Sequence, residues 1–325
     1  MYINYRIERE KELIMNFENK KIAILLPCYN ESLTISKVIH DYREAFPSAD
    51  IYVYDNNSTD GTDEIARQAG AIVRYEYQQG KGNVVRSMFK DIDADVYIMA
   101  DGDDTNPPVP AMAQMILDGK CDMVIGDRLS STYFTENKRP FHNTGNRLVR
   151  SLINHLFKVN VKDIMTGSRA FSYAFVKTYP VLSQGFEIET EMTIHAAAHH
   201  LSMEEVPVDY RDRPEGSESK LNTFSDGAKV LKTIARLFKE YKPTVFFDIF
   251  ALIFLLIAIG FGVPVFQAYF KTGLVERFPT LIFAGVMLII AILLWITGVI
   301  LQVIVKKDLQ MFELIWIRTK REKTH

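Results

Sequence analysis

Short apolar runs alternate with amphipathic segments over the first third of the chain. Five apolar runs have the length of buried strands: 21–26, 51–54, 71–75, 96–100 and 123–125. Three segments between them repeat their apolar residues at helical spacing: 32–46, 63–69 and 82–92. Strands separated by helices of this length predict a mostly parallel sheet in an α/β domain.

The pattern changes in the last third, where two long apolar stretches follow each other. Residues 244–266 and 281–305 are each long enough to cross a bilayer, and Asp248 near one end is their only charged residue. A buried core helix can be equally apolar, but two in succession with a short link favour a pair of membrane spans. The segments 146–158 and 224–242 are amphipathic instead. The second leads directly into a span, so we expect it to lie in the membrane interface rather than to pack on its own domain.

Basic residues are concentrated at the two outer ends of this pair of spans. They come before the first span and after the second: Lys229, Lys232, Arg236, Lys239, Lys242, Lys306, Lys307, Arg318, Lys320, Arg321 and Lys323. The linking loop contains only Lys271 and Arg277. The positive-inside rule therefore predicts a multi-pass hairpin in the plasma membrane, with the main domain and both termini in the cytoplasm. The predicted parts are an N-terminal appendage, the α/β domain, an interface helix, the hairpin and a basic tail: 1–20, 21–223, 224–243, 244–305 and 306–325.

Composition changes this picture little. The chain of 325 residues has a net charge of −2, which gives no support for a nucleic-acid partner. Cys28 and Cys121 form no metal-type spacing and fit a reducing compartment. The charged segment 2–21 lacks the apolar core of a signal peptide, and Met15 could be the native start.

Polar residues follow three of the predicted strands, at 30–31, 55–57 and 101–104. Because ligands bind at the carboxyl ends of the strands in such sheets, we expect the three loops to form one cleft. The last loop places three carboxylates within four positions, which suits a hard divalent cation such as Mg²⁺ or Mn²⁺ with substrate phosphates. The alternative is an acidic turn leading into Pro107.

Two further patterns are less specific. Gly80-Lys81-Gly82 fits neither the dinucleotide fingerprint nor the P-loop, so Lys81 either binds a phosphate of a nucleotide or is a solvated surface lysine. His195 and His199 are four residues apart, but no third metal ligand is spaced nearby, and we expect them on a helix surface.

Seven motifs, taken in order, resemble a known enzyme family. PCYNE at 27–31, YDNNSTDGT at 54–62, ADGDD at 100–104 and GDR at 126–128 resemble the family 2 glycosyltransferases. Another three resemble the branch that transfers sugars to polyprenyl phosphate, similar to dolichol-phosphate mannose synthase: DIMTGSRAF at 163–171, GFEIETE at 185–191 and GSESKL at 216–221. The resemblance covers about residues 20–305 and implies a GT-A fold, an inverting mechanism and a nucleotide-sugar donor.

The resemblance also implies roles for individual residues. The nucleotide-sugar pocket would contain Pro27, Tyr29, Glu31, Asp55, Asp101 and Glu189. Asp103 would bind the metal on the diphosphate directly, and Asp101 would contact the ribose or a metal-bound water. Asp163 would orient the acceptor or act as a base. Asp104 stands where the family often has leucine and is expected to begin a turn, whereas Ser168 replaces an aromatic residue and could alter the sugar fit.

The acceptor can be argued from charge. A lipid phosphate monoester has a second pKa of about 6, so it is largely dianionic at neutral pH and can attack without a strong general base. It needs cations, because two anionic substrates must approach each other. The candidates are Arg128, Arg139, Arg147, Arg211, Arg213 and Lys220. Arg128 fits a family position and is grouped with Asp103 and Asp163 as catalytic, while ordinary solvated arginines are the alternative for Arg139 and Arg147.

Together these features predict a membrane enzyme that transfers a hexosyl unit from a UDP-sugar, with glucose or N-acetylglucosamine favoured, to undecaprenyl phosphate. A processive polysaccharide synthase is the nearest alternative, but neither Trp295 nor Trp316 sits in a Q-x-x-R-W motif. The intact Asp101 and Asp103 pair argues against an inactive membrane scaffold. Two spans offer little room for a transport pathway, so a transporter is the least favoured alternative. Pairing with a second copy of the chain stays open.

Overall fold

The computed structural model describes residues 17, 19–130, 142–214 and 223–324. They form two compact units. The first contains the residues up to Ile234 together with those from Leu314 onward, and the second contains Ala235–Glu313.

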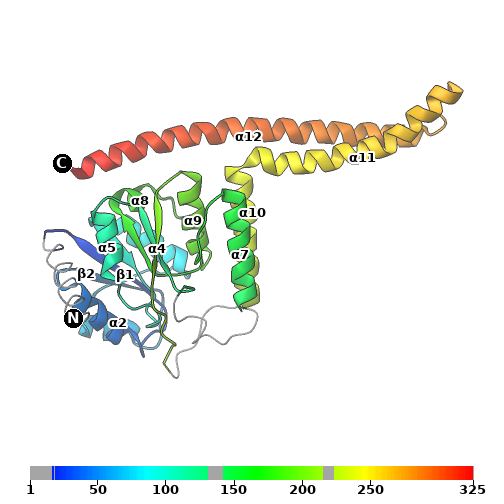
Figure 1. Cartoon of the computed structure of the whole chain (residues 1–325). Coiled ribbons are helices and arrows are strands. Elements are labelled where there is room, and N and C mark those ends of the chain that lie inside the picture. Colours follow the sequence, from blue (N-terminus) through cyan, green and yellow to red (C-terminus); the bar gives the residue numbers. More distant parts are fainter. Residues whose placement is uncertain (1–16, 18, 131–141, 215–222, 325) are drawn as a thin grey trace. The chain divides into compact units, whose positions relative to one another are not determined.

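The first unit is built on a mixed sheet, whose seven described strands have the order β3-β2-β1-β4-β6-β5-β7 (Figure 1). The strands are β1 (Ile22–Cys28), β2 (Asp50–Asp55), β3 (Ile72–Tyr75), β4 (Val96–Met99), β5 (Met123–Asp127), β6 (Arg169–Ser172) and β7 (Met203–Pro207). All neighbouring pairs are parallel except those of β6, which runs antiparallel to both β4 and β5. The carboxyl ends of β1, β2 and β4 therefore lie at one edge of the sheet.

Helices connect these strands, and one more helix follows the last strand. They are α2 (Ile35–Ala45), α3 (Thr62–Gln68), α4 (Lys81–Asp91), α5 (Pro110–Leu117), α7 (His142–Phe157), α8 (Tyr173–Thr178), α9 (Ile188–Ala198) and α10 (Thr223–Tyr241). All five strands and three helices expected within 21–125 are present, each ending within three residues of its predicted bounds. The prediction of an α/β domain is confirmed.

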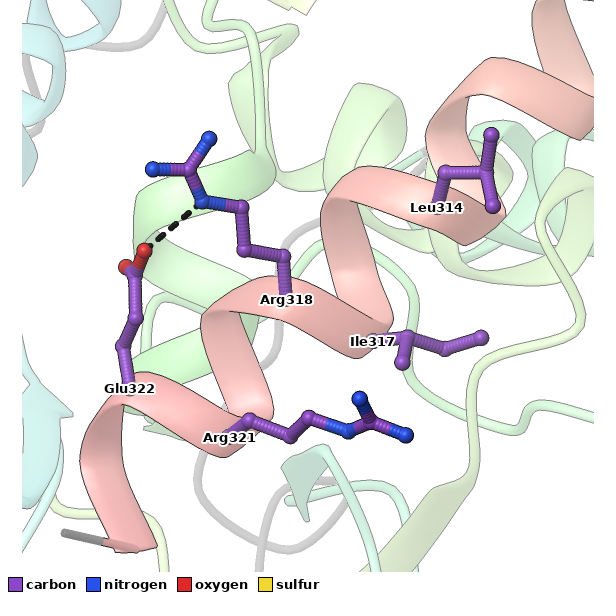
Figure 2. A pocket seen from close by; sticks show the side chains of 5 residues that line it. All are labelled: Leu314, Ile317, Arg318, Arg321 and Glu322. Carbon is purple, nitrogen blue, oxygen red and sulfur yellow. Dashed lines mark hydrogen bonds and ion pairs between the residues drawn. The ribbon is translucent and has the colours of Figure 1, made fainter.

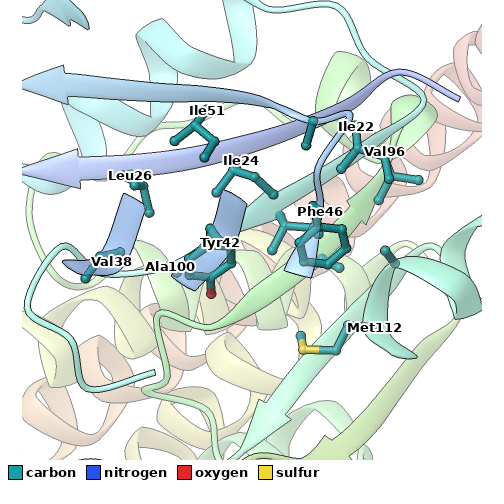
Figure 3. Packing of buried hydrophobic residues seen from close by; sticks show 14 of the residues in the cluster. Ile22, Ile24, Leu26, Val38, Tyr42, Phe46, Ile51, Val96, Ala100 and Met112 are labelled. Carbon is teal, nitrogen blue, oxygen red and sulfur yellow. The ribbon is translucent and has the colours of Figure 1, made fainter. Parts of the chain in front are cut away.

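The two faces of the sheet bury different side chains. Alternate residues of a strand point to opposite faces, and Ile22, Ile24 and Leu26 of β1 pack in one cluster with Tyr42 and Phe46 (Figure 3). The buried residues of α2 recur at helical spacing, which is why this segment forms a helix against the sheet. Burying each large aliphatic side chain contributes about 1.5–3 kcal/mol.

The second unit consists mainly of two long apolar helices. They are α11 (Pro243–Thr272) and α12 (Phe278–Thr324), each with a mean hydropathy of 2.8 in its most apolar window. Only 22% and 11% of these windows are buried, so most of their apolar side chains face outward, as in helices surrounded by lipid. These properties indicate a membrane protein.

The two apolar helices approach each other closely at Gly298. A Cβ atom added there would lie 3.1 Å from Phe247 Cβ and 3.3 Å from Thr244 Cα. Thr244 Oγ1 also donates a hydrogen bond to Gln302 Oε1 at 3.0 Å. Small residues that let two backbones approach, supported by a polar contact, are typical of helix pairs in membranes.

The end of α12 returns to the first unit. The residues after 306, predicted as a basic tail, are helical to Thr324. Lys320 Nζ lies 3.1 Å from Asp122 Oδ1, and Lys323 Nζ lies 3.0 Å from Asp95 Oδ1. A shallow hollow of about 400 Å³ is lined by Leu314, Ile317, Arg318, Arg321 and Glu322, all on this helix (Figure 2).

Candidate functional site

The loops after β1, β2 and β4 meet at the carboxyl edge of the sheet. Asn30 N donates to Ser58 Oγ at 2.9 Å, which joins the first loop to the second. Thr34 Oγ1 donates to Gly102 O at 2.6 Å, which joins the first loop to the acidic one. The convergence expected from the polar clusters is confirmed.

Lys81, the first residue of α4, lies between two carboxylates. Its Nζ is 2.5 Å from Asp101 Oδ1 and 2.6 Å from Glu189 Oε1. Burial alone would lower the pKa of Lys81, but the charges of Asp101 and Glu189 outweigh it and raise that pKa. Burial opposes ionisation of Asp101, yet the Lys81 ammonium holds the pKa of Asp101 below its usual value, whereas burial raises the pKa of Glu189. Lys81 is therefore buried between two carboxylates, and its interpretation as a solvated surface lysine is wrong.

Asp103 is bound from two sides. Its Oδ1 accepts from Thr105 N at 3.1 Å and from Thr105 Oγ1 at 2.6 Å, and its Oδ2 accepts a short hydrogen bond from Arg213 Nη2. Asp104 adopts a left-handed backbone with φ of 62°, as the turn prediction requires, and its carboxylate pairs with Lys37 and Arg211 instead. Asp101 and Asp103 thus face the cations of the cleft, and Asp104 belongs to the outer turn.

These two carboxylates fit a divalent ion that arrives with a diphosphate. Within the described ranges, His, Cys, Asp and Glu side chains form no group of three or more that could hold a metal by itself. Mg²⁺ and ions like it are commonly held by one or two carboxylates plus substrate phosphates, so a third protein ligand is not needed. Lys81 and Arg213 neutralise the same carboxylates and would have to shift when the ion binds.

A buried acceptor lies at the end of β2. Asp55 Oδ2 accepts from Ser58 N at 3.0 Å, while Asp55 Oδ1 is buried and accepts no hydrogen bond from the described part of the chain. A buried oxygen without a donor is costly, which makes it suited to an N–H or O–H group of a ligand. Pro27 lies in β1 beside Tyr54, Tyr29 is 39% exposed in the loop after β1, and Glu31 is buried there.

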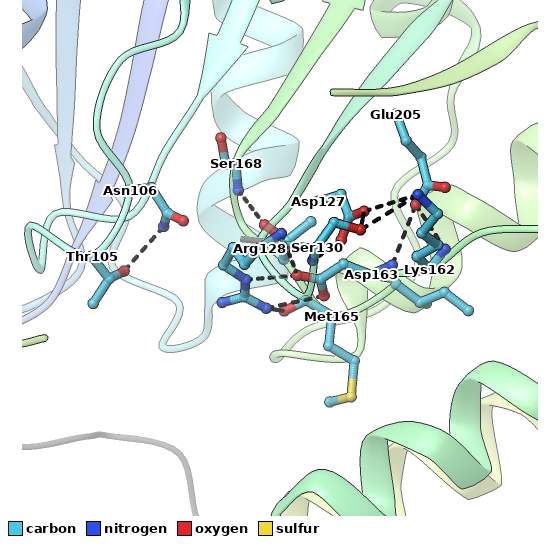
Figure 4. A network of polar contacts seen from close by, with 12 residues as sticks. Thr105, Asn106, Asp127, Arg128, Ser130, Lys162, Asp163, Met165, Ser168 and Glu205 are labelled. Atoms are coloured by element: carbon cyan, nitrogen blue, oxygen red, sulfur yellow. Dashed lines mark hydrogen bonds and ion pairs between the residues drawn. The ribbon is translucent and has the colours of Figure 1, made fainter. Parts of the chain in front are cut away.

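Arg128 and Asp163 form a buried, bidentate ion pair (Figure 4). Arg128 Nε is 2.8 Å from Asp163 Oδ2, and Arg128 Nη2 is 3.1 Å from Asp163 Oδ1 and 3.1 Å from Met165 O. A Cβ atom added to Gly167 would lie 2.2 Å from Asp101 Oδ2, so the loop that carries Asp163 packs directly against Asp101. The Arg128 pair and the Lys81 pairs therefore belong to one site.

Besides Arg213, the structure describes two further predicted cations, Arg211 and Arg147. Arg211 Nη1 is 2.6 Å from Asp41 Oδ2 and 3.0 Å from Asp104 Oδ1, on the outer turn. Arg147 is exposed near the start of α7. Arg139 and Lys220 lie outside the described residues.

The histidines of α9 are a correction to the sequence prediction. His195 and His199 were expected on a helix surface, but they are only 2% and 8% exposed. Their rings lie 4.1 Å apart, and His195 packs 4.9 Å from the Tyr179 ring. Burial holds the pKa of His195 well below its usual value, so the ring stays neutral. The apolar residues around them on α9 are buried as well, which leaves this helix without a solvent face there.

Two charged residues that contact the Asp163 loop are not among the predicted site residues. Arg169 is fully buried beside the Asp163 loop, and Glu205 of β7 accepts from Lys162 N at 2.7 Å. Arg169 stands within a quoted motif, and a charged residue at the start of a buried strand could have drawn attention to it. Glu205 carries no such signal in the sequence.

Comparison with solved structures defines the class of fold. The crystal structure of glucosyl-3-phosphoglycerate synthase from Mycobacterium tuberculosis, in complex with Mn²⁺, UDP-glucose and phosphoglyceric acid, matches with a TM-score of 0.55 at 20% identity. The match covers 70% of this chain and 83% of that one. This likeness shows a GT-A-like mixed α/β fold.

Sequence comparison then gives the family. The model of glycosyl transferase family 2 matches residues 23–179. Glycosyltransferase AglJ of Haloferax volcanii is 36% identical over 252 residues, which cover 76% of this chain and 81% of AglJ. The dolichyl-phosphate hexose transferase of the same organism is 31% identical over 67% of this chain and 94% of its own length. This chain therefore belongs to glycosyltransferase family 2, and the predicted family and fold are confirmed.

Proposed function

We propose that this protein transfers a hexosyl unit from a UDP-sugar to polyprenyl phosphate, such as undecaprenyl phosphate, at the cytoplasmic leaflet of the plasma membrane. The observation that carries the proposal is the set of paired charges at the edge of the sheet. Two carboxylates suited to a metal–diphosphate, Asp101 and Asp103, lie in one site with the Arg128–Asp163 pair. A relative named for dolichyl phosphate and the two apolar helices support a lipid acceptor.

The donor would occupy the side of the cleft formed by β1, β2 and β4. Asp55 Oδ1 would accept a hydrogen bond from the nucleoside, with Pro27, Tyr29 and Glu31 beside it. Asp101 and Asp103 would hold Mg²⁺ or Mn²⁺ together with the diphosphate. The bound ion would neutralise charge on the departing diphosphate. Lys81, freed from Asp101, would contact a phosphate oxygen.

The acceptor would bind through its phosphate to arginine. A phosphate oxygen of the lipid attacks the anomeric carbon, the bond from that carbon to the UDP oxygen breaks, and the electron pair leaves with UDP. A single displacement of this kind inverts the anomeric configuration. Arg128 and Arg213 would position the lipid phosphate, and Asp163 would orient Arg128 through its bidentate pair. Because the dianion is already a nucleophile, Asp163 need not take a proton.

Transfer of label into lipid tests this function. Membranes containing the protein are incubated with polyprenyl phosphate and a panel of labelled nucleotide sugars, each with and without a chelator and added Mn²⁺. We expect label from UDP-glucose or UDP-N-acetylglucosamine to become extractable into organic solvent, and the chelator to prevent it. Long, water-soluble polymer as the labelled product would support a processive synthase instead, and no metal-dependent release of UDP would support an inactive scaffold.

A further inference from the structure

The loop that carries Asp163 is held by charged side chains through its own backbone (Figure 4). Glu205 Oε1 accepts from Lys162 N at 2.7 Å and from Asp163 N at 3.3 Å. Arg128 Nη2 donates to Met165 O at 3.1 Å. These contacts hold the loop backbone on both sides of Asp163.

Arg169, the first residue of β6, binds two further carbonyl groups of the same loop. Its Nη2 donates to Ile164 O at 2.6 Å, and its Nε donates to Thr166 O at 3.1 Å. The side chain is 0% exposed, so these hydrogen bonds have no competition from water. Consecutive carbonyls of the loop are therefore bound alternately by Arg169 and Arg128.

The same guanidinium also reaches α9. Arg169 Nη1 donates to Thr193 Oγ1 at 3.0 Å, and Thr193 Oγ1 donates to Glu189 O at 3.0 Å. Glu189 in turn binds Lys81, the partner of Asp101. A continuous chain of hydrogen bonds thus runs from the Asp163 loop to the Lys81 pairs.

This arrangement is energetically costly, which argues that it serves the site. Within the described residues, the donors of Arg169 go to carbonyl and hydroxyl oxygens and to Met123 Sδ rather than to a carboxylate. Burial lowers the pKa of Arg169 to about 10, so the group is still charged at neutral pH. Well-packed apolar side chains often stabilise a core as much as buried charges do. Fold stability alone therefore does not explain a buried arginine here.

We infer that Arg169 and Thr193 are positioning residues, which join the Asp163 loop to α9 so that both halves of the site keep one fixed geometry. We call Arg128 and Asp163 the acceptor side, and Lys81 and Glu189 the donor side. These names rest on the proposed function. Neither Arg169 nor Thr193 contacts a substrate in this mechanism.

A pair of matched substitutions on α9 isolates the link. Thr193→Val removes the hydroxyl that accepts the hydrogen bond from Arg169 Nη1. Thr190→Val removes a hydroxyl that is also buried on α9 but makes no hydrogen bond within the described residues. Both substitutions replace threonine by valine, which has nearly the same shape. They therefore differ only in whether the hydrogen bond to Arg169 is lost. Thr193→Ser keeps the hydroxyl and serves as the rescue.

Kinetics of the purified full-length protein give the first readout. Loss of a hydrogen bond to a charged group changes a binding constant by about tenfold. We expect Thr193→Val to raise both the KM for the UDP-sugar and the KM for polyprenyl phosphate, by up to about tenfold each, whereas Thr190→Val and Thr193→Ser change neither. Arg169→Lys, which cannot reach all its acceptors at once, should raise both KM values. Equal kinetics for Thr193→Val and Thr190→Val would overturn the inference.

Hydrogen exchange gives a second readout that needs no ligand. We expect Thr193→Val to speed amide exchange in both 162–168 and 186–194, and Thr190→Val to speed it in neither. If the wild-type protein binds no UDP-sugar, the proposed function fails, but exchange still decides whether the link exists. Unchanged exchange at 162–168 in Thr193→Val would show that the loop and α9 are independent.

Discussion

At the scale of single residues, the cations of the cleft that the structure describes are bound to carboxylates. Lys81 pairs with Asp101 and Glu189, and Arg213 pairs with Asp103. Pairing offsets part of the desolvation cost of such buried charges, and removing one partner leaves the other charge buried and uncompensated. A metal–diphosphate brings both signs at once. The ion can take over Asp101 and Asp103, the diphosphate can bind Lys81, and the lipid phosphate can bind Arg213, so the exchange leaves no buried charge alone.

Asp103 is the sharpest single-residue test. Asp103→Asn keeps the size of the side chain but removes the charge that an ion and Arg213 require. We expect sugar transfer to fall by about a thousandfold, with the protein still present in the membrane fraction. Asp104→Asn is the matched control, because Asp104 belongs to the outer turn with Lys37 and Arg211. Near-normal transfer by Asp103→Asn would contradict the metal assignment.

Arg128 tests the acceptor side. Lysine keeps the positive charge but cannot make the bidentate contact with Asp163 or reach Met165 O as well. We expect Arg128→Lys to raise the KM for polyprenyl phosphate about tenfold and to leave the KM for the UDP-sugar unchanged. Arg67→Lys, on the exposed surface of α3, is the control. A rise in the KM for the UDP-sugar alone would place Arg128 with the donor instead.

Sequence could identify these carboxylates but could not settle the state of their neighbours. Strand ends and turn residues are local features, so the sequence alone assigns Asp55, Asp101 and Asp103 to one cleft. The burial of Lys81 depends on Glu189, 108 positions away, and the burial of His195 depends on packing against Tyr179. Both depend on contacts between distant segments, which no local pattern contains.

At the scale of elements, the short distance between the Asp163 loop and the strand end of β4 decides the shape of the site. Gly167 leaves no room for a side chain, because Asp101 Oδ2 lies where its Cβ would be. Closer approach of the two segments brings Asp101 and Arg128 near enough to interact electrostatically. The glycine therefore determines how close the donor and acceptor groups can come.

Gly167→Ala tests this element contact. The added methyl group must push the loop or Asp101 aside, and a displacement of about 1 Å can cost about a hundredfold in rate. We expect a loss of transfer of that size, with a melting temperature close to that of the wild type in detergent. Gly285→Ala is the control, because a Cβ atom there meets no atom within 4 Å. Normal transfer by Gly167→Ala would show that the spacing is not critical.

The strand order shows what periodicity could predict about elements and what it could not. The five strands of 21–125 follow from their apolar runs, because each alternates with a helix in sequence. β6 inserts antiparallel between β4 and β5, and β7 adds beyond β5. These pairings join strands that are far apart in the chain, and the four residues of β6 are too few for a pattern to identify.

At the scale of the whole molecule, the chain leaves the first unit through α10 and returns to it at Leu314. The returning helix end carries Trp316, which is 7% exposed, and the ammonium groups of Lys320 and Lys323. Lys320 also lies 4.9 Å from the Trp316 ring, and Lys323 lies 4.8 Å from the ring of Tyr173. The first unit thus contains residues from both before and after the apolar stretch Ala235–Glu313.

Packing should contribute more to this attachment than charge does. Partly exposed ion pairs are worth about 0.2–1 kcal/mol each, whereas truncation of a buried tryptophan costs about 3–5 kcal/mol. We therefore expect Trp316→Ala to release the end of α12, and Lys320→Glu with Lys323→Glu to loosen it only slightly. Cleavage by trypsin after Arg318 and Arg321 measures the release, because a docked helix end is protected. Trp295→Ala is the control, since Trp295 is 55% exposed within the apolar part of α12. Faster cleavage in the charge-reversed protein than in Trp316→Ala would show that ion pairs hold the helix end.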